Sequence, residues 1–358
     1  MTFDVSLKAW LALSLTRGLG GESARRLLKE FGSPDAVFAS SISSLNSVVK
    51  ADIAAEISKG IADDVIAPAL AWLEDGNNHI VTLADSDYPQ ALLNIPDPPL
   101  LLYVKGRLDL LNRSALAIVG SRSATPQGIN NAEAFAKSLS DAGLCIISGM
   151  AHGIDAAAHR GALRGQGSSI AIVGTGLDKV YPAANRDLAH ALAQQGALIS
   201  EFPLGTPPLA ANFPRRNRLI SGMSLGCLVV EASLQSGSLI TARLALEQGR
   251  DVFAIPGSIH APQSKGCHAL LKQGAKLVET AQDILEELGG LLVSPAQGAN
   301  SEGPDSALLE HLGFDPVDVD TLSVRCGLTI AELSAMLLTL ELNGRICVLP
   351  GGLYQRIH

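Results

Sequence analysis

From residue 116 onward, short apolar runs alternate with longer stretches in which apolar residues recur at helical spacing, such as GINNAEAFAKSLSDAG. Strands that alternate with helices of this length predict right-handed βαβ units and a parallel sheet. The loops that leave such strands share one edge of the sheet, where ligands bind. The six predicted strands are LAIVGSR, LCIISGM, SIAIVGTG, ALISEFPLG, LGCLVVEAS and DVFAIPG.

The patterns on either side of this repeat predict two smaller domains and a linker. Residues 1–78 have helical periodicity and form a predicted N-terminal helical domain. The α/β domain takes residues 79–288 and begins with a Pro-rich connector at 80–110. Residues 289–305 are rich in Gly, Ser and Pro and predict a flexible linker. Residues 306–358 predict a helix, a turn, a second helix and a two-stranded wing around PGG, which is a winged-helix pattern.

Composition supports an α/β protein and limits the cellular compartment in which we expect it. The chain is 47% hydrophobic and 17% charged, with a net charge of -8. It contains no apolar run of about 18 residues and no basic region before a signal-like segment. Its five cysteines form no CxxC pair, so we expect free thiols and a cytoplasmic protein. The negative net charge disfavours binding of nucleic acid over the whole protein surface but permits binding in a local basic pocket.

The loop after the first predicted strand, VGSRSATPQG, has the composition of a phosphate cradle. Gly120 permits close backbone approach, and Pro126 suits the first turn of a helix, whose N-terminus attracts anions. The alternative is a tight turn with a solvated arginine. The candidate phosphate contacts are Gly120, Ser121, Arg122, Ser123 and Thr125.

The second loop, SGMAHGIDAAAHRGAL, carries His152, Asp155 and His159 at spacings that allow one helix face. A metal site is one interpretation. We instead expect no metal, with Asp155 capping the helix and His159 making an internal hydrogen bond, because Ala156–Ala158 indicate tight packing. The chain also lacks a GxGxxG fingerprint and a P-loop, which disfavours nicotinamide or flavin binding, and we expect no cofactor.

The third loop, GTGLDKVYPAANRD, offers Lys179 and Arg186 as candidate phosphate contacts and Tyr181 as a stacking surface. The alternative is a long loop with ordinary surface charges.

The segment NFPRRNRLI carries the densest cluster of cations, with Arg215, Arg216, Asn217 and Arg218 at the start of a predicted helix. The helix macrodipole does not favour cations there, so helix stability does not explain them. Arg215 and Arg218 can share a face. We expect part of the cluster to bind a polyanion and the rest to pair with carboxylates such as Glu201 and Glu231.

The fifth loop starts another helix with Ser236, Gly237 and Ser238, followed by Thr241. Amide and hydroxyl donors again favour an anion. Four such loop ends on one sheet edge suit a chain of phosphates better than a single phosphate ester.

Taken together, these motifs resemble the DNA-processing protein A (DprA/Smf) family. The motifs are VGSR, SGMAHGIDAAAH, IAIVGTGLDKVYPAAN, ISEFPLGTPP, FPRRNRLISGMS, VVEASLQSGSLITARLALEQGRDVFAIPG and SKGCHALLKQGAKLV. The resemblance implies a Rossmann-like core from about residue 80 to 288. It extends to a winged-helix tail and to an N-terminal domain in which RGLGGESARRLL looks like a helix-hairpin-helix or SAM-like turn. A duplex-DNA role for that turn and simple packing are both open.

The resemblance implies a non-catalytic protein that binds single-stranded DNA during natural transformation. Such proteins protect the incoming strand, load a RecA-type recombinase and act as homodimers. By likeness, Gly120, Ser121 and Arg122 contact phosphates. The segment from Gly266 to Val278 resembles the self-association and recombinase-facing region, with Leu270, Leu271 and Leu277 as candidate interface residues. Many members have a basic residue where this chain has His152, which weakens the case for a phosphate contact there.

Two alternatives belong to other classes of protein. The core more distantly resembles nucleoside-monophosphate phosphoribohydrolases, which use a PGG.GT..E stretch with a catalytic Glu; here the region reads EASLQSGSLITARLALEQ. The tail could also belong to a winged-helix transcription regulator. However, its second helix, GLTIAELSAMLLTLELNG, has Glu332 and Glu341 but no Lys or Arg, which disfavours DNA contact.

Overall fold

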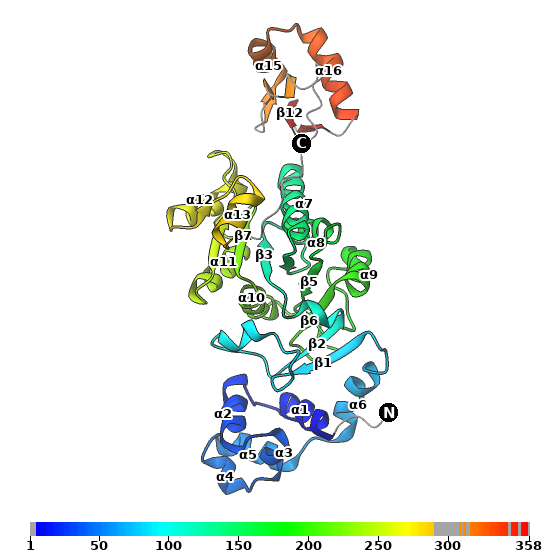
Figure 1. Ribbon diagram of the computed structural model, residues 1–358, viewed down its shortest axis with the longest axis vertical. Helices are drawn as coiled ribbons and strands as arrows, with labels where there is room; N and C mark the ends of the chain where they lie inside the picture. Colours follow the sequence, from blue (N-terminus) through cyan, green and yellow to red (C-terminus); the bar gives the residue numbers. More distant parts are fainter. Residues whose placement is uncertain are drawn as a thin grey trace.

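A computed structural model describes residues 5–289, 308–309, 311–312, 316–342, 345–349 and 352–356. Figure 1 shows three regions along the long axis: a group of helices next to the N-terminus, a central sheet covered by helices, and a small helical unit next to the C-terminus. The predicted linker at 289–305 lies outside the described residues, except for Gly289. Within the described part of the chain, no helix is long and apolar enough to cross a membrane.

The central sheet has nine strands in the order β1-β2-β6-β5-β4-β3-β7-β8-β9. All six predicted strands are confirmed, and their β-branched residues are buried on both faces, as a parallel sheet requires. The chain runs outward from β3 through β4, β5 and β6, and then returns to the other side of β3 with β7. The strands are β1 Asn78–Thr82, β2 Leu101–Gly106, β3 Ala115–Val119, β4 Cys145–Ser148, β5 Ser169–Ile172, β6 Ala197–Ser200, β7 Gly226–Val229, β8 Asp251–Ala254 and β9 Lys276–Leu277.

Helices cover both faces of this sheet, which confirms the Rossmann-like α/β class. One face packs against α7 (Pro126–Asp141), α8 (Ile154–Ala162), α9 (Arg186–Gln195) and α13 (Ala281–Glu287). The other packs against α10 (Asn212–Gly222), α11 (Ser238–Glu247) and α12 (Lys265–Lys272). Successive strand residues alternate between these two cores, as the period of a strand dictates: Leu116 and Ile118 face one, and Ala117 and Val119 face the other.

The region at 80–110, expected to be a connector, contributes two strands to the sheet. β2 pairs with β6 in antiparallel orientation, and β1 pairs with β2 in the same way. Between them, the proline-rich segment 95–99 follows the 3-10 helix η1 (Gln90–Asn94). The connector reading was therefore wrong at both ends of the segment and right only for its middle.

The N-terminal region is helical, as predicted, and packs on β2. Leu11 of the first helix shares an apolar core with Leu101 and Tyr103 of β2, and Trp72 contacts the Tyr103 ring edge-on. The helices are α1 Val5–Leu15, α2 Gly21–Phe31, α3 Pro34–Ala39, α4 Ile42–Asn46, α5 Ala51–Lys59 and α6 Asp63–Trp72.

The C-terminal region has the predicted winged-helix arrangement. α15 (Val319–Cys326) and α16 (Ile330–Leu342) precede the two wing strands, β11 (Ile346–Leu349) and β12 (Leu353–Arg356). A short strand that the sequence did not predict, β10 (Val317–Asp318), pairs with β12. Gln355 of β12 hydrogen-bonds to Gln127 of α7 at 2.5 Å, which links this region to the central one.

Candidate nucleic-acid interface

A cavity of about 730 Å³ opens at the carboxyl edge of the sheet, where the loops after β3 and β7 meet. These strands are neighbours, but their crossover helices lie on opposite faces, so the cavity marks the topological switch point at which open α/β sheets bind ligands. The turn after β3, the start of α10 and the start of α11 form most of its wall. Of the predicted site, it brings together Gly120, Ser121, Arg122, Ser123, Arg216, Asn217, Ser236, Gly237 and Ser238.

The turn after β3 presents Arg122 to solvent. A Cβ on Gly120 would come within 2.6 Å of Ile154, and a Cβ on Gly153, whose φ is +73°, within 2.3 Å of the Ser121 carbonyl. The two glycines thus let the turn pack directly on the start of α8. Arg122 lies in the exposed part of the turn, and its Cζ is 5.8 Å from the centre of the Phe213 ring.

The N-terminus of α7 is already occupied by a carboxylate of the protein. The Glu231 carboxylate accepts hydrogen bonds from the Thr125 amide at 2.9 Å and from the Thr125 hydroxyl at 2.5 Å. A Cβ on Gly128 would come within 2.3 Å of the same carboxyl group. Burial raises the pKa of Glu231, and the two Thr125 hydrogen bonds oppose that shift. The expected pairing of Glu231 with an arginine is therefore wrong, and the Thr125 hydroxyl is held inside the protein.

The open helix N-terminus is that of α11. Ser236, Gly237, Ser238 and Thr241 all line the cavity. The Ser236 and Ser238 hydroxyls lie 2.7 Å apart, which fixes the turn before the helix. An anion in the cavity would meet the positive end of the α11 dipole and the amides of its first turn.

Arg216 and Asp155 form the floor of the cavity. Arg216 is only 4% exposed and donates to the carbonyls of Gly149, at 2.8 Å, and Ile172. Burial lowers the pKa of Arg216 to about 10, an effect that Asp155 opposes, so the guanidinium stays charged at neutral pH. Burial raises the pKa of Asp155, whereas Arg216 and the amides of Ala151 and Gly149 lower it.

Two aromatic rings stand at the cavity wall. Tyr181 and Phe213 lie 5.6 Å apart, centre to centre, and both line the cavity. Sequence reasoning identified Tyr181 but missed Phe213. The available signal was an aromatic residue directly before Pro214 and the arginines, in the first turn of α10.

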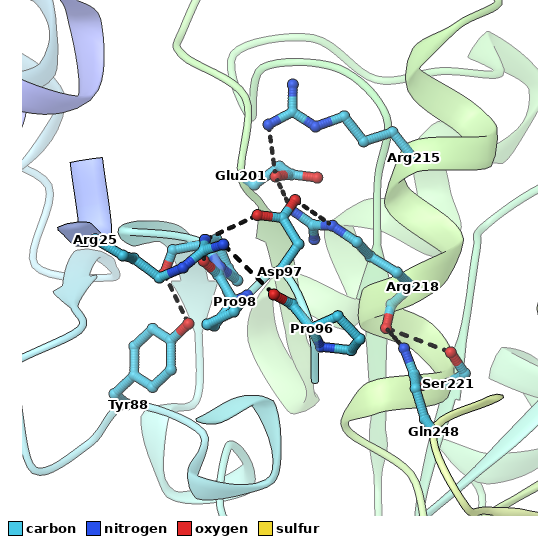
Figure 2. Close-up of polar contacts among 11 residues, drawn as sticks. Arg25, Tyr88, Pro96, Asp97, Pro98, Glu201, Arg215, Arg218, Ser221 and Gln248 are labelled. Carbon is cyan, nitrogen blue, oxygen red and sulfur yellow. Dashed lines mark hydrogen bonds and ion pairs between the residues drawn. The ribbon is translucent and has the colours of Figure 1, made fainter. Parts of the chain in front are cut away.

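The remaining arginines of α10 belong to a separate ion-pair network (Figure 2). Arg218 pairs with Glu201 at 2.6 Å, and Arg215 pairs with the same oxygen at 3.2 Å. The predicted shared face and the pairing with Glu201 are confirmed. Neither arginine lines the cavity, and their expected role as DNA contacts stays a prediction.

Of the other candidate residues, Lys179, Arg186 and His159 lie outside the cavity wall, whereas Asp155 is part of it. The Lys179 ammonium donates to the Gly205 carbonyl at 2.7 Å, and Arg186 is exposed at the start of α9. His159 makes the predicted internal hydrogen bond, to Ser169 at 2.7 Å. Asp155 accepts hydrogen bonds from the amides of Gly149 and Ala151, which precede α8, and so does not cap the helix in the expected way. Among the described residues, no His, Cys, Asp and Glu side chains gather as a metal-binding group.

The fold and this edge define a Rossmann-like protein whose switch-point cavity is lined by arginines and a helix N-terminus, between an N-terminal helical region and a winged helix. The chain belongs to the DNA recombination-mediator protein A (DprA/Smf) family, whose profile matches residues 79–289. The profile of the DprA winged helix domain matches residues 293–352.

Individual relatives agree with this assignment. Protein Smf of Escherichia coli is 47% identical over 303 residues, which cover 82% of this chain and 81% of that protein. The crystal structure of DNA processing protein A from Streptococcus pneumoniae has a TM-score of 0.70 and 37% identity, covering 78% of this chain and 97% of that one. DNA processing protein A from Helicobacter pylori, whose structure concerns its single-stranded DNA binding mode, has a TM-score of 0.54 and 32% identity. It covers 59% of this chain and 95% of that one.

Proposed function

We propose that this protein binds single-stranded DNA in the switch-point cavity, as a non-catalytic DNA-processing protein of natural transformation. It would work in the cytoplasm without a cofactor, protect the incoming strand and load a RecA-type recombinase on it. The observation that carries the proposal is the meeting of three features at one cavity: the Arg122 guanidinium, the open N-terminus of α11, and the Tyr181–Phe213 ring pair. Guanidinium groups and helix amides bind phosphates, and aromatic rings stack on unpaired bases.

The proposal predicts tight binding to single strands with little preference for sequence. Stacking and phosphate contact do not depend on base identity, and the bases of a duplex are not free to stack on protein rings. Affinity should fall with salt by a log–log slope of about -0.7 for each phosphate neutralised. Titration of single-stranded and duplex oligonucleotides of equal length at several salt concentrations measures both. Equal affinity for the duplex, or binding that does not respond to salt, would refute the proposal.

Self-association belongs to the same proposal, and one of its three candidate leucines suits it best. Leu270 is 6% exposed and lies in the core, while Leu271 is partly buried against that core. Leu277 is 48% exposed on β9, at one end of the sheet order. Edge strands with an exposed apolar residue readily pair with another chain. A dimer would place two cavities on one strand of DNA.

We therefore expect Leu277→Glu to give monomers. Binding to a long strand should weaken by at least about tenfold, because the second cavity no longer engages at high effective concentration. Binding to an oligonucleotide that fills one cavity should not change. Sedimentation at micromolar concentration measures the oligomeric state. The control is Ile42→Glu, which places the same charge at another exposed apolar residue, in α4. A wild-type monomer would contradict the dimer.

The alternative function, phosphoribohydrolase-like catalysis, requires a carboxylate that faces the substrate. Glu231 is the residue nearest to that role in sequence, but its carboxylate is held by Thr125 and it does not contribute to the cavity wall. Asp155 does line the cavity, but it is buried beside Arg216 and accepts backbone amides. No observation favours this second function over strand binding.

A further inference from the structure

Helix α10 has two functional faces. Phe213, Arg216 and Asn217 face the cavity, whereas Arg215 and Arg218 face away from it, toward Glu201. Because one rigid helix carries both sets, a shift of the outward face moves the cavity wall as well. The outward contacts therefore matter for the strand that the cavity would bind.

The outward face is tied to the N-terminal helices through one acidic residue (Figure 2). One carboxylate oxygen of Asp97 accepts a hydrogen bond from Arg218 Nε at 3.2 Å, and the other accepts one from Arg25 Nη1 at 2.8 Å. Arg25 comes from α2, and it also donates to the Pro98 carbonyl at 2.8 Å. Charges of opposite sign thus alternate from Arg25 through Asp97 and Arg218 to Glu201.

The segment that carries Asp97 is built to be stiff. Asp97 lies between Pro96 and Pro98, whose rings fix their φ angles. The buried Tyr88 hydroxyl donates to the Pro99 carbonyl at 2.7 Å. At the far end of α10, a Cβ on Gly222 would come within 2.8 Å of Ile95, so this segment also packs closely on the helix.

Glu201 and Arg218 form the buried end of the network, and each charge there is offset by the other. The Glu201 side chain is 3% exposed and that of Arg218 is 12% exposed. Burial raises the pKa of Glu201, and the Arg218 charge opposes that shift. One terminal atom of each side chain, Glu201 Oε1 and Arg218 Nη1, is buried without a hydrogen-bond partner among the described residues. The Arg218 guanidinium is thus held from two sides by charge, by Asp97 and by Glu201.

We infer that Arg25, Asp97 and Arg218 are positioning residues through which the N-terminal helices set the place of α10 and hence the affinity of the cavity. The inference rests on the proposed strand-binding function. Arg25 would act without touching DNA. The apolar contact of Leu11 with Leu101 and Tyr103 remains when Arg25 is removed, so the domain should stay docked and folded.

The test compares Arg25→Ala with Arg26→Ala in the full chain. Both remove one arginine from α2, but Arg26 is exposed whereas Arg25 is partly buried against Asp97. In Arg25→Ala, hydrogen exchange across α10 should speed up by about tenfold, while that of α7 stays unchanged. Affinity for a single-stranded oligonucleotide should fall about 3- to 10-fold, with the salt slope unchanged because no phosphate contact is lost. Asp97→Asn should have the same effect, Arg25→Lys should restore part of it, and Arg26→Ala should match the wild type.

Each other result overturns the inference in a different way. Unchanged exchange in α10 would show that Arg25 does not hold the helix, and this arm needs no DNA. Faster exchange with normal affinity would make the network purely structural. A reduced salt slope would make Arg25 a direct phosphate contact. If the wild type fails to bind any strand, the proposed function fails, and the inference fails with it even where α10 responds.

Discussion

Replacing Arg216 with alanine is expected to lower the free energy of unfolding by about 3–5 kcal/mol, the range for breaking a buried charge pair. Arg216 is 4% exposed, beside the buried Asp155. Its removal leaves that carboxylate without the positive charge that offsets its burial. It also removes the hydrogen-bond donor of the Gly149 and Ile172 carbonyls. Denaturant unfolding of the wild type and the variant measures the difference.

The neighbouring residue provides a matched control. Arg215 is 57% exposed and shares Glu201 with Arg218, so Arg215→Ala should cost less than about 1 kcal/mol. Asp155→Asn in the Arg216→Ala background should recover part of the loss. Equal stability of the two single variants would contradict the assigned role of Arg216.

The pH dependence of the Arg216→Ala variant follows from the same pair. Without Arg216, the largest opposition to the burial that raises the pKa of Asp155 is lost, and only the amides of Ala151 and Gly149 and the charge of Arg122 still lower it. A carboxyl group whose folded pKa lies above its unfolded value binds more protons in the folded state, so its burial costs more as pH rises between the two values. The stability deficit should therefore shrink as pH falls toward about 4, near the ordinary pKa of Asp.

The parallel core was predictable because its signal is local. Each buried strand is a short β-branched run between turns, and six such runs became β3 to β8. β1 and β2 were missed because their hairpin joins the sheet only through the antiparallel pairing of β2 with β6, about a hundred residues further along the chain. The prolines between them, which suggested a connector, fall in the segment that packs on α10.

The cavity lies at the sheet edge that the sequence indicated, but the state of each candidate side chain was not predictable. Helical spacing correctly placed Arg215 and Arg218 on one face. It could not reveal that Arg216 is buried, where it donates to the carbonyls of Gly149, just after β4, and of Ile172 in β5. Likewise, the occupation of the α7 N-terminus by Glu231 joins residues 106 positions apart. Contacts of this kind leave no trace in local sequence. Of the two helix starts predicted to favour an anion, that of α7 is occupied by Glu231, whereas that of α11 lines the cavity.

Arg122→Ala is expected to weaken binding to single-stranded DNA by about 1.5–3 kcal/mol, the range for a charge-assisted hydrogen bond. Arg122 lies in the exposed turn after β3, over the Phe213 ring at the cavity wall. A phosphate there would gain the guanidinium contact, and a base stacked on Phe213 would lie beside the same cation. Stability should change by no more than about 0.5 kcal/mol, because the side chain is outside the core.

The salt dependence separates a lost phosphate contact from a distorted cavity. Losing one phosphate contact should reduce the log–log slope by about 0.7, whereas distortion lowers affinity without that change. Arg122→Lys should keep the slope but recover only part of the affinity, since an ammonium group cannot make the bidentate contact. Arg113→Ala is the control, because Arg113 precedes β3 and so lies at the opposite edge of the sheet, paired with Asp109. If Arg122→Ala binds the oligonucleotide as Arg113→Ala does, the strand does not pass the turn after β3, and the phosphate path must be sought elsewhere on the protein.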